Sequence, residues 1–496
     1  MIEELLHWDI KNKKLLKLAE EVDLINKEFL LLDCSLNDYV SYEMPNMNRA
    51  RSLSKKLDYF LKHSNTLNPQ SSFDRLVLQE IKDNLFTQKE YVDFFFTKKY
   101  NKEWGVRDFF NYCFFPEKEF IDDPQNKGAL AYLESLLGNL NHKVQTEREN
   151  LMDDIFSFSP SFNDDEFEQM LIEQLPRLRE LIYSFNEDMG FETEEQIKSQ
   201  RKISKELEKD MLERRKQRLY NLNPKFPTKG LNLTGDIKDL FFDLVLGYGG
   251  YSSYSSNIKT IEAGVERFYF YKDPNTGGIK FYSGELDRVM GHENFHRLQY
   301  YFSRFMPPSL SHNFSEGYTI TGRTICEGTA NVLEKNFLNW MSKNKKQLGL
   351  SDIDIKISAL EDGVWIGNKV IRLCHSIYHR EAFSDEEKSD DDAHLKLAKI
   401  SKIPIFADSD YLANESIPET FYYSFYIFGK KYVTETLNEL QKIETKRLGS
   451  KRKANSFLKK NEPVVIQGLL TGNWGWGTHK DFFLKHYWPK ARKYCN

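Results

Sequence analysis

Two histidines stand at metal-ligand spacing, with a glutamate beside the first, in the segment His292-Glu293-Asn294-Phe295-His296. The segment reads H-E-x-x-H. On a helix, residues four apart lie on one face, so both imidazoles can reach the same ion. The glutamate beside the first histidine is then close enough to take a proton from a bound water. This pattern is typical of zinc peptidases, although five residues are only moderately specific. Two buried core histidines, satisfied by hydrogen bonds, are the alternative.

The next helical segment, Ile325–Glu334, offers a third ligand. We expect this ligand to be Glu327, with Glu334 and Glu316 as alternatives. Two histidines and one glutamate leave one zinc position open, as catalytic sites require. Small residues at 328–330 are expected to let this helix approach the histidine helix closely. Asn331 and Glu334, one and two turns beyond Glu327, are expected to orient the ligands.

Together, His292–His296 and Glu327-Gly328-x-Ala330 resemble the gluzincin metallopeptidases, whose third zinc ligand is a helical glutamate. Within that clan the motifs are most similar to carboxypeptidase Taq, thimet oligopeptidase and angiotensin-converting enzyme. The resemblance covers about residues 245–440 and implies a mostly helical, zincin-like fold with a β-ribbon beside the site. Glu327 is not followed by the Ser-Asp pair of thermolysin-like enzymes, so the resemblance does not identify the carboxylate that orients the ligands.

Two further groups of residues could complete such a site. The segment Phe421–Gly429 supplies tyrosines for the oxyanion of the attacked carbonyl, with Tyr426 similar to a late tyrosine of the helical families and Tyr423 as the alternative. His379 could assist them. A substrate carboxylate could be bound by a basic cluster near the middle of the C-terminal half, namely Arg372, His375 and Arg380. Packed aromatic residues and ordinary core or surface roles are the alternatives.

The elements that must position these residues are mainly helices. Apolar spacing predicts amphipathic helices through residues 1–225, a histidine helix over about 285–305 and a third-ligand helix over about 324–341. Alternating residues on either side of a Pro-Asn-Thr-Gly-Gly turn predict an antiparallel β-hairpin over about 265–283. The Pro-containing segment 223–227 is the best boundary between an N-terminal helical domain, 1–225, and a catalytic domain, 226–496.

Composition restricts the class of protein further. The chain has 496 residues, a formal net charge of -4 and 29% charged residues, so nothing overall draws it to nucleic acid or anionic lipid. Five scattered cysteines argue against a disulfide framework. No secretory signal or membrane-spanning run is evident, which predicts a cytoplasmic protein. The acidic segment 384–392 and the basic segment 442–460 are expected to be solvated loops.

These observations predict a mostly α-helical, zinc-dependent metallopeptidase that acts on a peptide or protein. His292, His296 and Glu327 would hold Zn²⁺, and Glu293 would be the general base. One alternative is a non-catalytic helical scaffold or interaction protein with a structural zinc site. Another is a protease effector dedicated to a single target.

Overall fold

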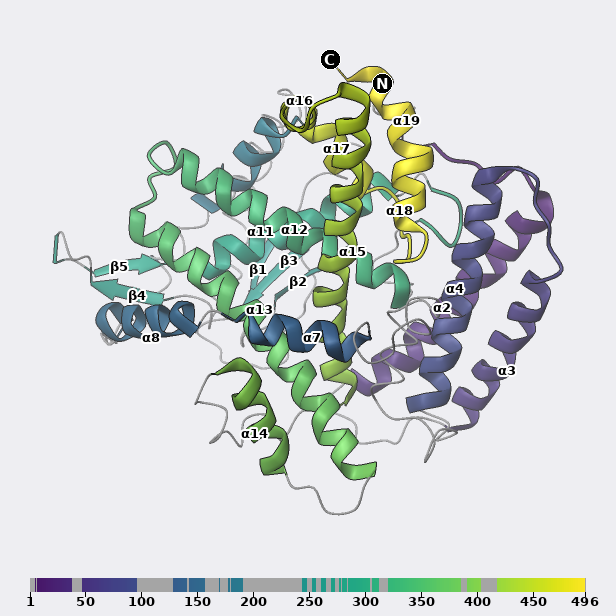
Figure 1. Cartoon of the computed structure of the whole chain (residues 1–496), viewed down its shortest axis with the longest axis horizontal. Helices are drawn as coiled ribbons and strands as arrows, with labels where there is room; N and C mark the ends of the chain where they lie inside the picture. Colours follow the sequence, from purple (N-terminus) through teal and green to yellow (C-terminus); the bar gives the residue numbers. More distant parts are fainter. Residues whose placement is uncertain are drawn as a thin grey trace. The chain divides into compact units, whose positions relative to one another are not determined.

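The computed structural model describes most of residues 5–95, 128–190, 243–311 and 320–402, and residues 417–495. Helices dominate this part of the chain (Figure 1), which confirms the mostly helical class. Within it, no helix is both long and apolar enough to span a membrane. The predicted domain boundary at 223–227 lies outside the described residues.

By their internal contacts the residues form two units. The first comprises residues 1–142, 302–329 and 365–496, and the second comprises 143–301 and 330–364. Two long helices contribute to both units: α12 (Ile320–Asn344) and α13 (Asp352–Ser384). Each unit therefore draws on segments from both sides of residue 225.

The first unit is helical throughout its described residues. Three N-terminal helices pack against one another (Figure 1): α2 (Lys13–Asn37), α3 (Met47–Ser64) and α4 (Ser72–Phe95). The other α-helices are α7 (Ala129–Gly138), α14 (Asp390–Ser401), α15 (Ile417–Leu448), α16 (Lys451–Lys460), α17 (Glu462–Leu469), α18 (His479–Asp481) and α19 (Trp488–Ala491). Two short helices complete the C-terminal region: a π-helix, η4 (Phe482–Tyr487), and a 3-10 helix, η5 (Arg492–Tyr494).

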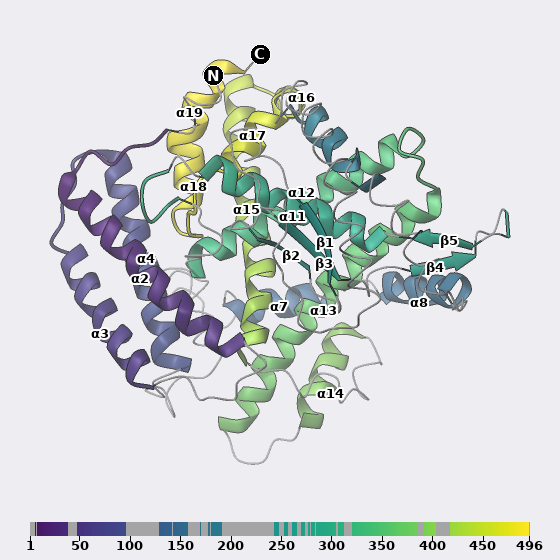
Figure 2. The same cartoon turned by 180° about the vertical axis from the view of Figure 1, so that it is seen from behind.

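The second unit contains the strands. A three-stranded sheet has the order β1-β3-β2, formed by β1 (Asp243–Gly247), β2 (Ser252–Ser255) and β3 (Thr260–Gly264). The outer strand β1 runs parallel to β3, whereas β2 runs antiparallel to it (Figure 2). Separately, β4 (Tyr269–Lys272) pairs antiparallel with β5 (Ile279–Tyr282), with Phe270 opposite Phe281. The sequence does not predict the three-stranded sheet, because β2 reads Ser-Ser-Tyr-Ser and carries only one residue with a strong strand preference.

Helix α8 (His142–Phe156) and the histidine helix α11 (Gly284–Ser303) also contribute to the second unit. Helix α11 packs closely on α12, because a Cβ at Gly291 would lie 2.5 Å from the ring of Phe337. The buried ring of Phe185 contacts both helices edge-on, with its centroid 5.8 Å from that of Phe295 and 5.0 Å from that of Phe337. This aromatic cluster supports the two helices that carry the candidate ligands.

Helices α12 and α15 make backbone contact where they cross. A Cβ on Gly328 would lie 2.0 Å from the carbonyl carbon of Gly429, and one on Gly429 would lie 1.9 Å from the carbonyl oxygen of Thr324. The expectation that Gly328 lets α12 approach the histidine helix is therefore wrong. Gly328 serves the crossing with α15, and Gly291 serves the approach to α11.

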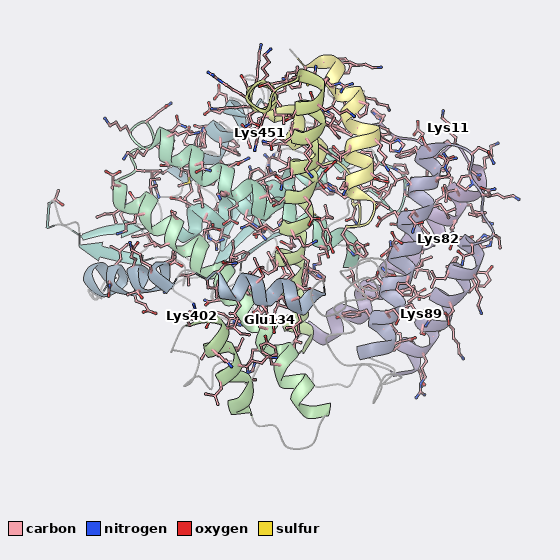
Figure 3. All side chains as sticks on the ribbon, in the orientation of Figure 1. Lys11, Lys82, Lys89, Glu134, Lys402 and Lys451 are labelled. Carbon is pink, nitrogen blue, oxygen red and sulfur yellow. The ribbon has the colours of Figure 1, made fainter. Side chains whose placement is uncertain are left out.

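The basic segment 442–460 is helical rather than a loop. Helix α15 continues to Leu448, Gly449 turns the chain with a φ of 68°, and Ser450 caps α16 by accepting a hydrogen bond from the amide of Lys453. Figure 3 shows the side chains around Lys451 in this region. A glycine in the left-handed conformation followed by a serine cap ends one helix and starts the next within two residues. The prediction of a loop, which rested on charge alone, is therefore wrong.

Candidate metal centre

The structure brings together the three predicted ligands, His292, His296 and Glu327. One ligand atom from each residue lies within 4.8 Å of the others, and all three side chains are buried. The two histidines are on α11 and the glutamate is on α12. This is the one group of three or more potential metal ligands found among the described residues.

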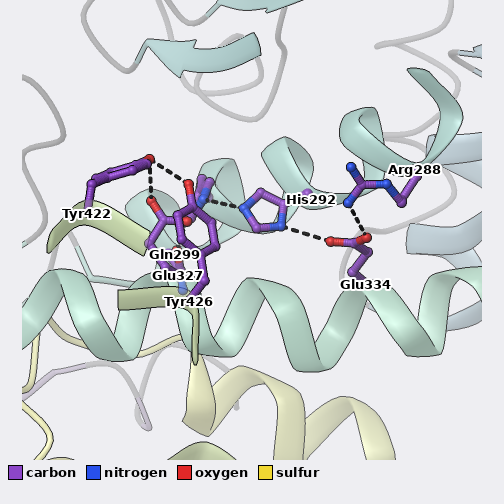
Figure 4. A network of polar contacts seen from close by, with 8 residues as sticks. Arg288, His292, Gln299, Glu327, Glu334, Tyr422 and Tyr426 are labelled. Carbon is purple, nitrogen blue, oxygen red and sulfur yellow. Dashed lines mark hydrogen bonds and ion pairs between the residues drawn. The ribbon is translucent and has the colours of Figure 1, made fainter. Parts of the chain in front are cut away.

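Glu334 contacts the first histidine on the side away from the other ligands (Figure 4). Its Oε2 lies 3.1 Å from Nδ1 of His292, and its Oε1 accepts a hydrogen bond of 2.7 Å from Arg288. Burial raises the pKa of Glu334, but Arg288 and His292 outweigh that effect and lower it to about 2. An ionised carboxylate can only accept hydrogen bonds, so Nδ1–H of His292 donates to Glu334, and in the neutral imidazole Nε2 is then the nitrogen that can bind a metal ion.

The second histidine is oriented in the same way by a neighbour on its own helix. Nδ1 of His296 lies 2.8 Å from the amide oxygen of Gln299, which accepts its proton. Gln299 was not predicted from the sequence to have a role. It stands three residues after a candidate ligand histidine, which places it on the same helical face.

The two Nε2 atoms of His292 and His296 face each other at 3.1 Å. Two ring nitrogens at this distance can share a proton in a hydrogen bond or, when both are deprotonated, bind the same cation. Zn–N bonds of 2.0–2.1 Å at a tetrahedral angle would separate two ligand nitrogens by about 3.3 Å. The imidazole pair therefore has nearly the spacing of zinc ligands, and the ligand atoms of the full set lie within 4.8 Å of one another.

Glu334 and Glu316 are the alternatives to Glu327 as the third ligand. Glu334 bonds to Arg288 and to Nδ1 of His292, on the side of that ring away from Glu327, and it does not belong to the group of three. Glu316 lies outside the described residues. Glu293 is buried and follows His292 on α11, where a general base is expected.

Tyr422, which was not among the tyrosines expected from the sequence, contacts one of the predicted ligands. Its hydroxyl lies 3.4 Å from Oε1 of Glu327 and 2.5 Å from the hydroxyl of Tyr426 (Figure 4). The guanidinium of Arg323 lies 4.9 Å from the centroid of the Tyr422 ring. Tyr426 is thus one hydroxyl away from Glu327, whereas Tyr423 accepts a 3.0 Å hydrogen bond from Arg372.

The predicted carboxylate-binding residues lie on α13, and none of them belongs to the three-residue group. Arg372 is partly buried and bonded to Tyr423, and His375 is buried. The side chains of His379 and Arg380 lie outside the described residues. One turn before Arg372, the buried ammonium of Lys369 lies 4.0–4.4 Å from the ring centroids of three aromatic residues, Trp365, Tyr423 and Tyr426.

Comparison of the sequence with protein-family models and with curated proteins gives no match.

Proposed function

We propose that this protein is a zinc-dependent metallopeptidase of the gluzincin type with a zincin-like fold. The observation that carries the proposal is the buried group His292, His296 and Glu327, in which both imidazoles present Nε2 to the same point. A set of two histidines and one glutamate leaves a position open for water, as in catalytic zinc sites. The H-E-x-x-H spacing places Glu293 beside that position.

His292, His296 and Glu327 would hold the zinc ion, which would supply Lewis acidity and lower the pKa of a bound water to near neutrality. Glu293 accepts a proton from the attacking water and passes it to the leaving amine. Tyr422 or Tyr426 donates to the oxyanion that forms on the attacked carbonyl. Arg372 on α13 remains the candidate for binding a substrate carboxylate.

The proposal is tested by cleavage of a quenched peptide library with the purified full chain. We expect cleavage that 1,10-phenanthroline abolishes and that zinc restores. Glu293→Gln is expected to keep zinc and to lower kcat/KM by at least about 10²-fold, because it removes the general base without removing a ligand. A Glu293→Gln protein with wild-type activity would refute the assigned mechanism.

The other classes predict different results in the same experiment. A scaffold with a structural zinc site would bind zinc and cleave no substrate, protein substrates included. An effector dedicated to one protein would bind zinc, leave the library intact and cleave its single target in a Glu293-dependent manner. Since all three classes bind zinc, the range of substrates cleaved and its dependence on Glu293 separate the two alternatives from a general peptidase.

A further inference from the structure

A buried carboxylate lies between an arginine and one of the candidate zinc ligands. Arg288 and His292 are four residues apart on α11, so they lie on the same face, and both bond to Glu334 on α12 (Figure 4). The exposed fractions are 2% for Arg288, 6% for His292 and 0% for Glu334. The three groups therefore form a chain of contacts that is shielded from water.

The two oxygens of Glu334 bond to different partners. Oε1 is 2.7 Å from Nη1 of Arg288, and Oε2 is 3.1 Å from Nδ1 of His292. A fully buried carboxylate is stable only when a counter-charge and hydrogen bonds replace its hydration. Arg288 supplies the counter-charge and holds Oε1, which leaves Oε2 directed at the imidazole.

We infer that Arg288 is a positioning residue for the metal centre, acting on His292 through Glu334. Its guanidinium fixes the carboxylate that in turn fixes the plane of the imidazole and the nitrogen that it presents. This inference rests on the proposed zinc site and adds a residue to it that contacts neither metal nor substrate. Loss of a carboxylate that orients a metal-bound histidine typically weakens metal binding by about 10–100-fold.

The test is the zinc dissociation constant of the full chain, measured by competition with a chromophoric chelator. Arg288→Met is expected to weaken zinc binding by about 10–100-fold, and Arg288→Lys, which keeps the charge but not the fork geometry, by less. Glu334→Gln should weaken it similarly. Arg288 acts through Glu334, so the two substitutions should not act independently. The fold-loss of zinc affinity in the double variant Arg288→Met/Glu334→Gln should therefore be smaller than the product of the fold-losses in the two single variants.

A matched control removes another arginine that pairs with α11. Arg177 lies 3.1 Å from the carboxylate of Asp287, the residue next to Arg288, and Arg177→Met deletes that ion pair while leaving Glu334 in place. It should bind zinc like the wild type. With Co²⁺ at saturation, the visible spectrum should change in Arg288→Met and stay the same in Arg177→Met, because only the first variant alters a ligand's orientation.

Wild-type zinc affinity in a folded Arg288→Met protein, or fully multiplicative losses in the double variant, would overturn the inference. If Arg288→Met does not fold, Arg288→Lys decides. Weaker zinc binding at an unchanged unfolding temperature supports the positioning role, and an unchanged dissociation constant refutes it. A wild-type chain that binds no zinc would instead contradict the proposed function, and this inference with it.

Discussion

At the residue scale, each candidate ligand histidine is oriented by a hydrogen bond at Nδ1, the ring nitrogen that faces away from the ligand group. Nδ1–H of His292 donates a hydrogen bond to Glu334, and Nδ1–H of His296 donates one to the amide oxygen of Gln299. The two Nε2 atoms face each other, 3.1 Å apart. The choice of ring nitrogen follows from the hydrogen bond on the opposite side of each ring.

Tyr422→Phe tests which tyrosine serves the centre. The substitution removes the hydroxyl that contacts Glu327 and Tyr426, so we expect kcat/KM to fall by about 10–100-fold while zinc is retained. Tyr423→Phe is the matched control, because the Tyr423 hydroxyl bonds to Arg372 and should change activity much less. Peptide cleavage by the two variants measures the difference. A larger loss in Tyr423→Phe would reverse the assignment.

At the element scale, α12 is the helix that the other two site helices contact. It meets α11 at Gly291 and Phe337, and it meets α15 at Gly328 and Gly429. The second crossing places Tyr422 of α15 beside Glu327. Glycine at these contacts has a steric reason, because a methyl group would overlap the neighbouring helix.

Gly429→Ala is expected to destabilise the protein by at least about 2 kcal/mol, because its Cβ would lie 1.9 Å from the carbonyl oxygen of Thr324. Gly367→Ala is the control within α13, since its Cβ would meet only Leu140 at an ordinary 3.5 Å. That control should be neutral or stabilising by up to about 1 kcal/mol through helix propensity. Chemical denaturation measures both values. Equal stability of the two variants would contradict the close crossing.

The sequence predicts the centre better than its surroundings. His292, His296 and Glu327 could be identified because i,i+4 spacing and helix periodicity are local properties of the chain. Tyr422 could not be separated from Tyr423 or Tyr426, because the face that α15 turns toward α12 depends on the contact between two glycines far apart in sequence. Arg288 was missed for a similar reason, since its role exists only once Glu334 is packed against α11.

At the scale of the whole molecule, segments from the two ends of the chain pack together in the first unit (Figures 1 and 2). The ring of Trp8 lies 5.2 Å from that of Phe482. Glu80 on α4 accepts hydrogen bonds from the amide of Gly475 at 2.8 Å and from the hydroxyl of Thr478. Burial raises the pKa of Glu80 to about 7, and these hydrogen bonds only partly oppose that effect.

This raised pKa predicts how stability depends on pH. Between about pH 4.5 and 7 the folded protein keeps the proton on Glu80 while the unfolded chain releases it, so the free energy of unfolding falls as pH rises. From pH 5 to pH 8 the loss should be roughly 2 kcal/mol. Urea denaturation should show Glu80→Gln gaining that amount relative to the wild type over the same interval. The comparison of the two proteins isolates Glu80 from the buried His479, whose pKa is lowered to about 4 and which acts in the opposite direction. A pH-independent difference would contradict the prediction.

The most direct test of the central claim is the zinc content of the purified chain, measured by inductively coupled plasma mass spectrometry. The wild type should contain one zinc ion per chain. His296→Ala should contain almost none, because it removes one of the three ligands, and the control His375→Ala should keep the full equivalent, because His375 lies outside the group. A wild type without zinc, or a His296→Ala protein that retains a full equivalent, would contradict the metal centre.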